Sequence, residues 1–286
     1  MKNKARMLKC LIIFICLVAL SVVFFAWQNN GLVITKYEYT NPKLPAAFNN
    51  FTIAHVSDLH NKDFHGKLID KIKQQNPEMI VITGDLIDRR STNIEIAEKF
   101  IQAVVKIAPT YYVSGNHEQL SDVYNTLKRK LQVLNVNVMD NAYEVINKNG
   151  SRIGLLGVAD PAVQQSEESY LWDNSTSYVE AELKDLLDDI DTSFNILLSH
   201  RPELFNLYRD LQADLVFSGH AHGGQIRMPF IGGLAAPNQG LFPKYTAGVY
   251  SSGATSMVVS RGLGNSIFPL RVFNRPELVV VTLKKS

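Results

Sequence analysis

Five short polar segments, each directly behind an apolar run, carry side chains that can bind metal ions. They are Asp58-Leu59-His60, Gly84-Asp85, Gly115-Asn116-His117-Glu118, Ser199-His200 and Gly219-His220-Ala221-His222. In α/β proteins the loops that leave the carboxyl ends of neighbouring strands converge on one crevice, so side chains far apart in sequence can meet there. The five segments therefore predict one shared site.

The donor types are carboxylate, imidazole and amide oxygen, with no thiolate. This set suits divalent zinc, manganese or iron, whereas calcium would need more oxygen ligands. Seven side chains are candidate ligands: Asp58, His60, Asp85, Asn116, His200, His220 and His222. Seven exceed what one catalytic ion with an open position uses, but they suffice for two ions that share a carboxylate. We expect a dinuclear site.

Each segment has a purely structural alternative when it is taken alone. Asp85 could cap a helix or form a turn, and Asn116 could occupy the left-handed region of a turn. His200 could be a hydrogen-bonded core histidine. The segment 219–222 is the most specific, because two imidazoles two residues apart beside a glycine have few structural uses. Together the five segments favour the metal site.

Other polar residues near these segments have open roles. Arg89, Arg90 and Arg201 lie beside the ligand segments, where a guanidinium could bind a phosphate, although surface or capping roles are equally compatible. His65 follows the first segment in a polar loop and could contact a substrate. His55 alternates with apolar neighbours, which favours a packing role.

Strand-like and helix-like segments alternate and must position these loops. Strand-like runs cover 51–57, 79–83, 111–114, 196–199 and 215–218, and helical spacing covers 67–75, 94–107, 122–134 and the region near 178–187. Asn149-Gly150 predicts a hairpin between 143–146 and 152–158, and 255–260 and 278–283 are the clearest later strands. Helices that cross between buried strands favour an α/β fold in which helices cover sheets.

Composition limits the class of protein. The 286 residues are 46% hydrophobic and 20% charged, which is typical of a globular protein with a full-sized core. The net charge of +2 comes without the clustered stripe of lysine and arginine that neutralises phosphates along a duplex, so nucleic acid is not an expected partner. Both cysteines, Cys10 and Cys16, lie in an apolar N-terminal run, which leaves no thiolate for the site.

That N-terminal run resembles a membrane anchor. No charge occurs from Cys10 to Trp27, and a helix of this length reaches about 27 Å, enough to cross a bilayer. Four basic residues precede it, so the positive-inside rule places the N-terminus in the cytoplasm and the rest outside. A cleaved secretory signal and a buried core helix are the alternatives. We expect a cytoplasmic tail and anchor at 1–30, a linker with an edge strand at 31–50, and one catalytic domain at 51–286.

The stretch from Met228 to Phe242 is apolar and rich in glycine, directly after the last ligand segment. It could form an apolar lip beside the site, which with the anchor would favour a lipid-linked substrate. The alternative is a hairpin that packs on a sheet edge.

In type and order, the five ligand segments resemble the signature of the calcineurin-like metallophosphoesterases. The resemblance covers about Phe51 to Leu283, and the segments 260–264 and 273–277 resemble a bacterial membrane-tethered subgroup. Some members of that subgroup are associated with cleaving the pyrophosphate of UDP-2,3-diacylglucosamine. The family fold implies a four-layer αββα sandwich of two mixed β-sheets flanked by helices, here preceded by one transmembrane helix.

The resemblance also implies a role for each residue. One metal would be held by Asp58, His60 and His222, the other by Asn116, His200 and His220, with Asp85 bridging. His117 would not be a ligand but would face the phosphate and protonate the leaving oxygen, and Glu118 would orient that imidazole. The resulting expectation is in-line attack by a hydroxide that bridges the two ions, without a covalent phosphoenzyme.

We therefore expect a phosphoester hydrolase that acts on a phosphodiester or pyrophosphate of an amphiphilic or nucleotide-linked substrate at the membrane. A general phosphomonoesterase and a non-catalytic metal-binding scaffold are the alternatives. The complete ligand set and the presence of His117 argue against the scaffold. No obligate protein partner is evident from the sequence.

Overall fold

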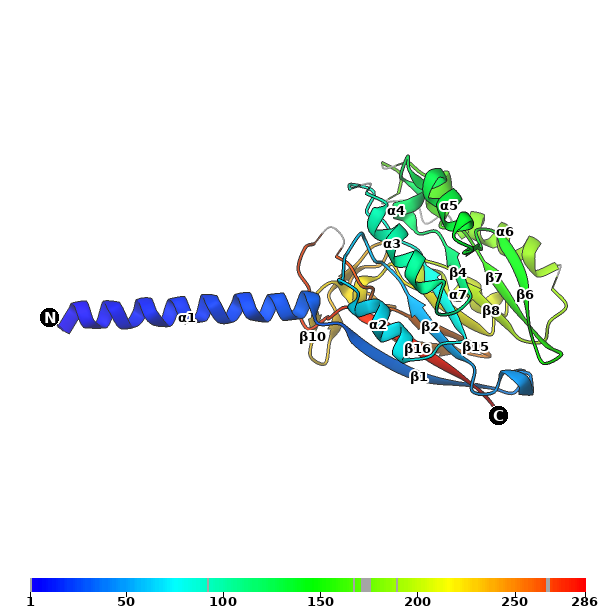
Figure 1. Ribbon diagram of the computed structural model, residues 1–286, viewed down its shortest axis with the longest axis horizontal. Helices are drawn as coiled ribbons and strands as arrows, with labels where there is room; N and C mark the ends of the chain where they lie inside the picture. The colour runs from blue at the N-terminus through cyan, green and yellow to red at the C-terminus, as the bar shows by residue number, and fades with distance from the viewer. Residues whose placement is uncertain (1, 92, 167, 171–175, 189, 266–267) are drawn as a thin grey trace.

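A long helix projects from a domain that contains all the other elements (Figure 1). The computed structural model describes residues 2–91, 93–166, 168–170, 176–188, 190–265 and 268–286. The helix α1 (Lys2–Asn30) is long and apolar enough to cross a membrane, and its most apolar part is not buried against the domain.

The first of two six-stranded sheets has the order β1-β16-β2-β3-β4-β5. Its strands are β1 (Val33–Asn41), β16 (Glu277–Lys285), β2 (Thr52–Val56), β3 (Met79–Thr83), β4 (Thr110–Val113) and β5 (Asn137–Val138). All neighbours are parallel except β16 and β2. The expected edge strand near the start of the domain is β1, which pairs along its whole length with the last strand.

The second sheet has the order β14-β15-β9-β8-β7-β6. Its strands are β14 (Gly248–Ser252), β15 (Thr255–Val259), β9 (Leu215–Ser218), β8 (Asn195–Leu198), β7 (Ser151–Gly157) and β6 (Ala142–Lys148). Antiparallel pairs flank the parallel centre. The hairpin predicted at Asn149-Gly150 joins β6 and β7, and the two residues have φ angles of 49° and 79°, which a tight two-residue turn requires.

Alternation along the strands produces the layers, because successive side chains point to opposite faces of a sheet. Ile53 and Val81 of the first sheet meet Leu155 and Phe217 of the second in a core between the sheets. The other face of the first sheet is covered by α2 (Lys67–Gln74), α3 (Glu95–Val104) and α5 (Tyr124–Val133), and that of the second by α6 (Thr176–Asp188) and α7 (Phe205–Asp210). The four-layer αββα prediction is confirmed.

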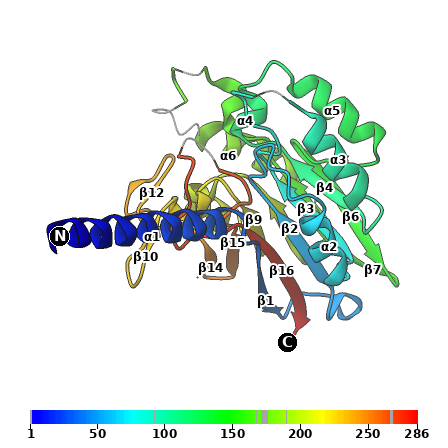
Figure 2. The ribbon, with the colours of Figure 1, turned by 60° about the vertical axis from the view of Figure 1, so that its left-hand side comes forward.

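The remaining elements are short. They are the one-turn helix α4 (Asn116–Gln119), the 3₁₀ turns η1 (Ala46–Phe48), η2 (Pro161–Gln164), η3 (Pro202–Leu204) and η4 (His222–Gly224), and the strands β10 (Arg227–Met228), β11 (Gly232–Gly233), β12 (Ala235–Ala236) and β13 (Gly240–Leu241). β10 with β11 and β12 with β13 form two small hairpins outside the large sheets, within the stretch for which a lip or a hairpin was expected. Figure 2 shows both hairpins beside α1.

Candidate metal centre

The seven predicted ligands follow five strands from both sheets. Loops after β2, β3 and β4 carry Asp58, His60, Asp85 and Asn116, and loops after β8 and β9 carry His200, His220 and His222. All seven residues are buried. The two sheets therefore contribute to one centre, as the convergence of strand ends leads us to expect.

Two groups of potential ligand atoms share one aspartate. Atoms of Asp58, His60, Asp85 and His222 lie within 4.8 Å of one another, and so do atoms of Asp85, His200 and His220. Asp85 Oδ2 is 3.5 Å from His60 Nε2 and 3.3 Å from His200 Nε2. The Asp85 carboxylate thus faces both groups.

The other short distances in the first group involve His222. Its Nε2 is 3.1 Å from His60 Nε2 and 3.3 Å from Asp58 Oδ1. The backbone N–H groups of His220 and His117 donate to Asp58 and Asp85, at 3.1 and 2.9 Å, and hold the two carboxylates in place.

Several buried polar atoms of this centre have no hydrogen-bond partner within the described parts of the chain. They are His60 Nδ1, Asn116 Oδ1, His200 Nε2 and His222 Nδ1. Among the imidazole nitrogens, His200 Nε2 is the one that faces another ligand, since His60 and His222 present Nε2 to their group. Buried polar atoms normally find a partner, and imidazole nitrogens and an amide oxygen are ligand types that divalent metals use. The residues present therefore fit a bound metal.

Neighbouring groups set which nitrogen each imidazole offers. His200 Nδ1 lies 2.6 Å from the Thr83 carbonyl oxygen, which can only accept, so Nδ1 carries a proton and Nε2 faces Asp85. Asn238 Oδ1 already accepts a 2.8 Å hydrogen bond from Arg201 and lies 2.9 Å from His220 Nε2. His220 Nε2 therefore donates, which leaves Nδ1 with a lone pair.

Burial and charge shift the pKa values of these groups. Burial lowers the pKa of His222 to about 4, and burial together with nearby His117 lowers the pKa of His60. Burial opposes protonation of His200, but the Asp85 carboxylate outweighs it and raises the pKa of His200 to about 10. In turn, His200 and His117 lower the pKa of Asp85 although burial acts to raise it. Positive charge is thus favoured beside Asp85.

The ligand loops have unusual backbones. Asp58, His60, Asp85, His220 and His222 all have φ between 46° and 62°, a region that residues other than glycine seldom adopt. Such strain persists where the surrounding structure enforces it, most often at functional sites. The loops also pack closely, since a Cβ added at Gly115 would collide with Asp85 Oδ1.

His117 lies beside the centre, and its partner differs from the one expected. The Arg89 backbone N–H donates to His117 Nδ1 at 3.2 Å, and Asp88 Oδ1 lies 3.6 Å from the same nitrogen. Glu118 instead accepts hydrogen bonds from the backbone of Asp85, Gly115 and Ile87 at 2.7, 2.8 and 3.1 Å. The expectation that Glu118 orients the imidazole is therefore corrected. Because Glu118 lies at the start of α4 with its carboxylate directed at backbone N–H groups, it ties the loops after β3 and β4 together.

A pocket of about 250 Å³ opens beside the centre. Asp85, Asn116, His117 and His220 form its polar side, and Ala235, Ala236, Pro237 and Phe268 form an apolar side. Arg89 and Tyr170 also line it, with the guanidinium 5.0 Å from the ring centre. This pocket is where a substrate could reach the buried side chains.

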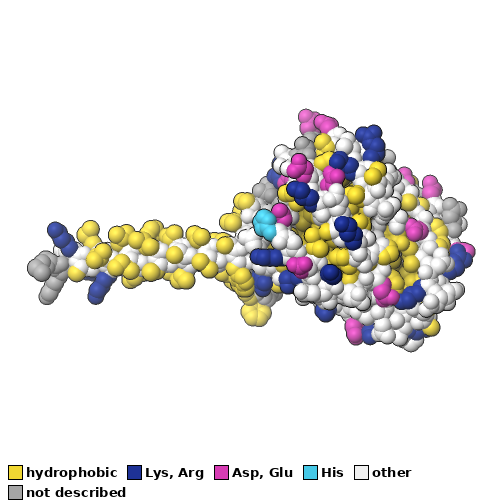
Figure 3. All heavy atoms as spheres, in the orientation of Figure 1, with side chains coloured by type: hydrophobic (Ala, Val, Ile, Leu, Met, Phe, Trp, Pro, Cys, Tyr) yellow, Lys and Arg dark blue, Asp and Glu magenta, His cyan; other side chains and the backbone are white. Residues whose placement is uncertain are grey.

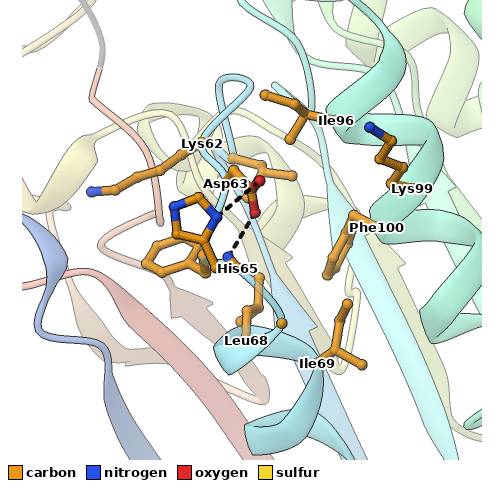
Figure 4. Close-up of a pocket in the computed structure, with 11 residues that line it drawn as sticks. Lys62, Asp63, His65, Leu68, Ile69, Ile96, Lys99 and Phe100 are labelled. Atoms are coloured by element: carbon orange, nitrogen blue, oxygen red, sulfur yellow. Dashed lines mark hydrogen bonds and ion pairs between the residues drawn. The ribbon is translucent and has the colours of Figure 1, made fainter.

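The other basic residues singled out in the sequence do not line this pocket. Arg201 is buried, does not line the pocket and forms two hydrogen bonds to Asp160 at 2.5 and 2.7 Å, so its contact with the centre runs through Asn238. Arg90 pairs with Asp88 at the surface. His65 lines a separate pocket of about 290 Å³ between α3 and the loop before α2, where it pairs with Asp63 at 3.3 Å (Figure 4). None of the seven predicted ligands lines that pocket as far as the described residues show.

A two-sheet sandwich with clustered aspartate and histidine side chains at its strand ends defines a metal-dependent hydrolase. The model of the calcineurin-like phosphoesterases matches residues 51–224. The chain belongs to this family, and it is a metal-dependent phosphoesterase. The family and the Asp/His cluster together imply that it binds divalent metal.

Three relatives illustrate the similarity. The uncharacterized metallophosphoesterase YkuE of Bacillus subtilis (strain 168) is 31% identical over 261 residues, which cover 88% of this chain and 85% of the relative. The phosphodiesterase YaeI of Escherichia coli (strain K12) is 27% identical, with 82% of each chain covered. A transmembrane protein with metallophosphoesterase domain from Bos taurus is 28% identical, with 93% of this chain and 60% of the relative covered.

Proposed function

We propose that the protein binds two divalent metal ions and hydrolyses a phosphodiester or pyrophosphate bond at a membrane surface. The observation that carries this proposal is the position of Asp85, whose Oδ2 faces His60 on one side and His200 on the other. A carboxylate that two groups of ligands share is what a dinuclear site needs. Mn²⁺, Zn²⁺ and Fe²⁺ all suit the ligand types.

In this proposal each metal has its own ligands beside the shared Asp85. Asp58, His60 and His222 would hold one ion, and Asn116, His200 and His220 would hold the other. Bound divalent ions supply a nucleophile from water and stabilise charge on phosphoryl oxygens. The protein contributes by fixing the ligands through buried hydrogen bonds before substrate arrives.

His117 is the proposed general acid. Its imidazole lines the pocket, and its ring centre lies 4.4 Å from that of His60. The Arg89 backbone N–H donates to Nδ1 at 3.2 Å, so Nε2 carries the proton of the ring. The Asp88 carboxylate 3.6 Å from Nδ1 adds negative charge beside the ring, which favours its protonated form. His117 can then give a proton to the leaving oxygen, and Asp88 would act as a positioning residue for it.

The proposed substrate is amphiphilic. The apolar side of the pocket supports this, because a phosphate held at the metal centre would leave its organic group against Ala235, Pro237 and Phe268. We propose that residues 1–30 form a cytoplasmic tail and an uncleaved anchor, residues 31–50 a linker with the edge strand β1 of the first sheet, and residues 51–286 an extracytoplasmic catalytic domain. The name of the bovine relative supports a membrane location.

Turnover by the full chain in detergent tests the activity. The chain is loaded with Mn²⁺, Zn²⁺ or Fe²⁺ and given a phosphodiester, a phosphomonoester, a soluble mononucleotide ester and an amphiphilic pyrophosphate. We expect the phosphodiester and the amphiphilic pyrophosphate to be cleaved fastest, with Asp85→Ala as the inactive control. Turnover no higher than the control would contradict the enzyme, and preferential cleavage of the soluble mononucleotide ester would contradict the substrate class.

Two alternative functions make different predictions in the same assay. A general phosphomonoesterase would prefer the monoester. A non-catalytic scaffold would bind metal, measured as ions per chain, and would show no turnover with any of the substrates.

A further inference from the structure

Exposed apolar side chains gather at the end of the domain from which α1 projects. Among the described residues outside α1, eight of the eleven exposed large apolar side chains fall in 228–242 and 268–273. Figure 3 shows apolar side chains around the base of the helix. We define the apolar rim as Phe230, Ile231, Leu241, Phe242, Phe268 and Phe273.

Hydrogen bonds join the segments that carry the apolar rim into one surface. Arg227 N donates to the Val272 carbonyl at 2.9 Å, which connects β10 to the segment before Phe273. Leu234 N donates to the Ile226 carbonyl and Phe242 N to the Leu234 carbonyl, both at 2.9 Å. Figure 1 places β10 at the base of α1, and Figure 2 shows β10 and β12 near the helix.

The last turn of α1 is attached to the same surface. Asn29 Oδ1 accepts hydrogen bonds from Asn265 Nδ2 and from the backbone of Arg271, both at 3.1 Å. Arg275 donates to the Gly31 carbonyl at 2.7 Å, and its guanidinium lies 4.6 Å from the Trp27 ring centre. The orientation of the domain relative to α1 is therefore constrained.

A ring contact relates the apolar rim to depth in a bilayer. The rings of Phe273 and Phe24 are 5.7 Å apart. Phe24 lies three residues before Trp27, about 4.5 Å further along the helix towards its apolar centre. Tryptophans at the ends of transmembrane helices lie at the membrane interface, which is where we place Trp27. Phe24 then lies at the edge of the hydrocarbon, and Phe273, which contacts it, reaches the same depth.

Three aromatic residues of the apolar rim also have strained backbones. Phe230, Phe242 and Phe273 have φ angles of 69°, 54° and 51°, and all three side chains are exposed. A bulky residue at positive φ is an outlier that glycine or asparagine would relieve. The exposed phenylalanine rings at these three positions do not stabilise the fold, so we infer that they contribute binding energy to a surface that contacts them.

The apolar rim is continuous with the mouth of the metal pocket. Phe268 belongs to both, and the hairpin β12–β13 lines the pocket with Ala235 and Ala236 while it carries Leu241 at its other strand. The connection between these two strands holds Asn238, which bonds to His220. A surface that engages the apolar rim would thus cover the entrance to the centre.

We propose that the apolar rim inserts into the outer surface of the bilayer that α1 spans, so that the metal pocket opens among the lipid headgroups. This inference rests on the membrane anchor of the proposed function. Because α1 would keep the domain at the membrane, the bilayer is the partner that always lies beside the apolar rim. Lys244, exposed two residues after Phe242, can reach anionic headgroups as basic side chains do at interfaces. The partner is a lipid surface, and the substrate is drawn from it.

Fluorescence quenching of the full chain in vesicles tests the insertion. In a Cys10→Ser, Cys16→Ser background, Phe230→Cys or Leu241→Cys is labelled with an environment-sensitive fluorophore. Val133→Cys is the matched control, because Val133 is an equally exposed apolar residue on α5, away from α1. The vesicles contain phosphatidylethanolamine and phosphatidylglycerol, with or without brominated acyl chains. We expect a blue shift and bromine quenching at both rim positions and neither at the control.

A label on native Cys16, with only Cys10→Ser changed, reports on α1 independently. If the label at Cys16 is quenched while the rim labels show no more quenching than the Val133→Cys control, the inference is overturned and the membrane anchor stands. Loss of quenching at Cys16 as well would overturn both. A third outcome is a blue shift at the rim that is unaffected by brominated lipid and grows with the protein-to-lipid ratio. It would mean that a second copy of the chain covers the apolar rim, and it would also overturn the inference.

Discussion

The carboxylate of Glu118 accepts a 2.7 Å hydrogen bond from the backbone N–H of Asp85, and this contact joins the loops after two neighbouring strands. The same carboxylate accepts from Gly115 and Ile87. Burial and the nearby Asp85 charge raise the pKa of Glu118 to about 7. Through these three hydrogen bonds the buried Glu118 carboxylate connects the loops after β3 and β4 beside the shared metal ligand Asp85.

Glu118→Ala should destabilise the protein strongly, because it leaves three buried N–H groups without an acceptor. Each such group costs about 1 to 3 kcal/mol, so we expect a loss of roughly 3 kcal/mol or more. Denaturant unfolding of the full chain in detergent measures this. The control Glu180→Ala breaks a surface pair with Lys184 and should cost below about 0.5 kcal/mol. Similar losses of unfolding free energy in the two variants would show that Glu118 does not stabilise these loops.

Loss of His117 should depend on the leaving group. His117→Ala should lower kcat by about 10² to 10⁴ for esters with a poorly acidic leaving alcohol, since general-acid help is then needed. Esters of p-nitrophenol leave without a proton, so their turnover should fall much less. Metal content should stay at the wild-type value. An equal fall for both esters would argue against proton donation by His117.

Asn238 should position His220. Asn238→Leu removes the acceptor for His220 Nε2, and loss of such a partner typically lowers metal affinity by about 10-fold to 100-fold. Asn238→Asp retains an oxygen at that position and should keep most of the affinity. Competition with a chromogenic chelator measures binding without relying on activity. Equal affinity in the Leu variant and the wild type would exclude this role.

The sequence predicts the layers and the convergence of the seven candidate ligands well, because both follow from local patterns. Apolar alternation predicts the strands, and each ligand follows a strand directly, so the common edge of the sheets brings them together. Their assignment to individual metals stays a prediction, since it came from the family resemblance.

Contacts between distant loops were not visible in the sequence. Asp88 beside His117, and Asn238 beside His220, come from loops whose course depends on packing rather than on a motif. The sequence places Asp88 three residues after Asp85 and so near the site. It does not show that the Asp88 side chain points towards His117. The strands β10 to β13 are only two residues long, too short for periodicity to reveal.

His55 should make the protein sensitive to acid. Its ring is buried against Phe217, its Nε2 is 2.8 Å from Thr83 Oγ1, and burial lowers its pKa to about 3. An unfolded histidine has a pKa near 6.5, so between these values the unfolded state binds the extra proton and native stability falls as pH decreases. At pH 5 this costs roughly 2 kcal/mol relative to pH 7.5.

His55→Gln retains a polar side chain opposite Thr83 but does not titrate. The variant should therefore lose less stability than the wild type between pH 7.5 and pH 5, by roughly 2 kcal/mol. Comparing the two proteins cancels the contribution of the metal-site histidines, which titrate in both. Denaturant midpoints at the two pH values, in the same detergent, give the difference. Parallel losses in both proteins would show that His55 is not the source of acid sensitivity, because only its own proton uptake separates them.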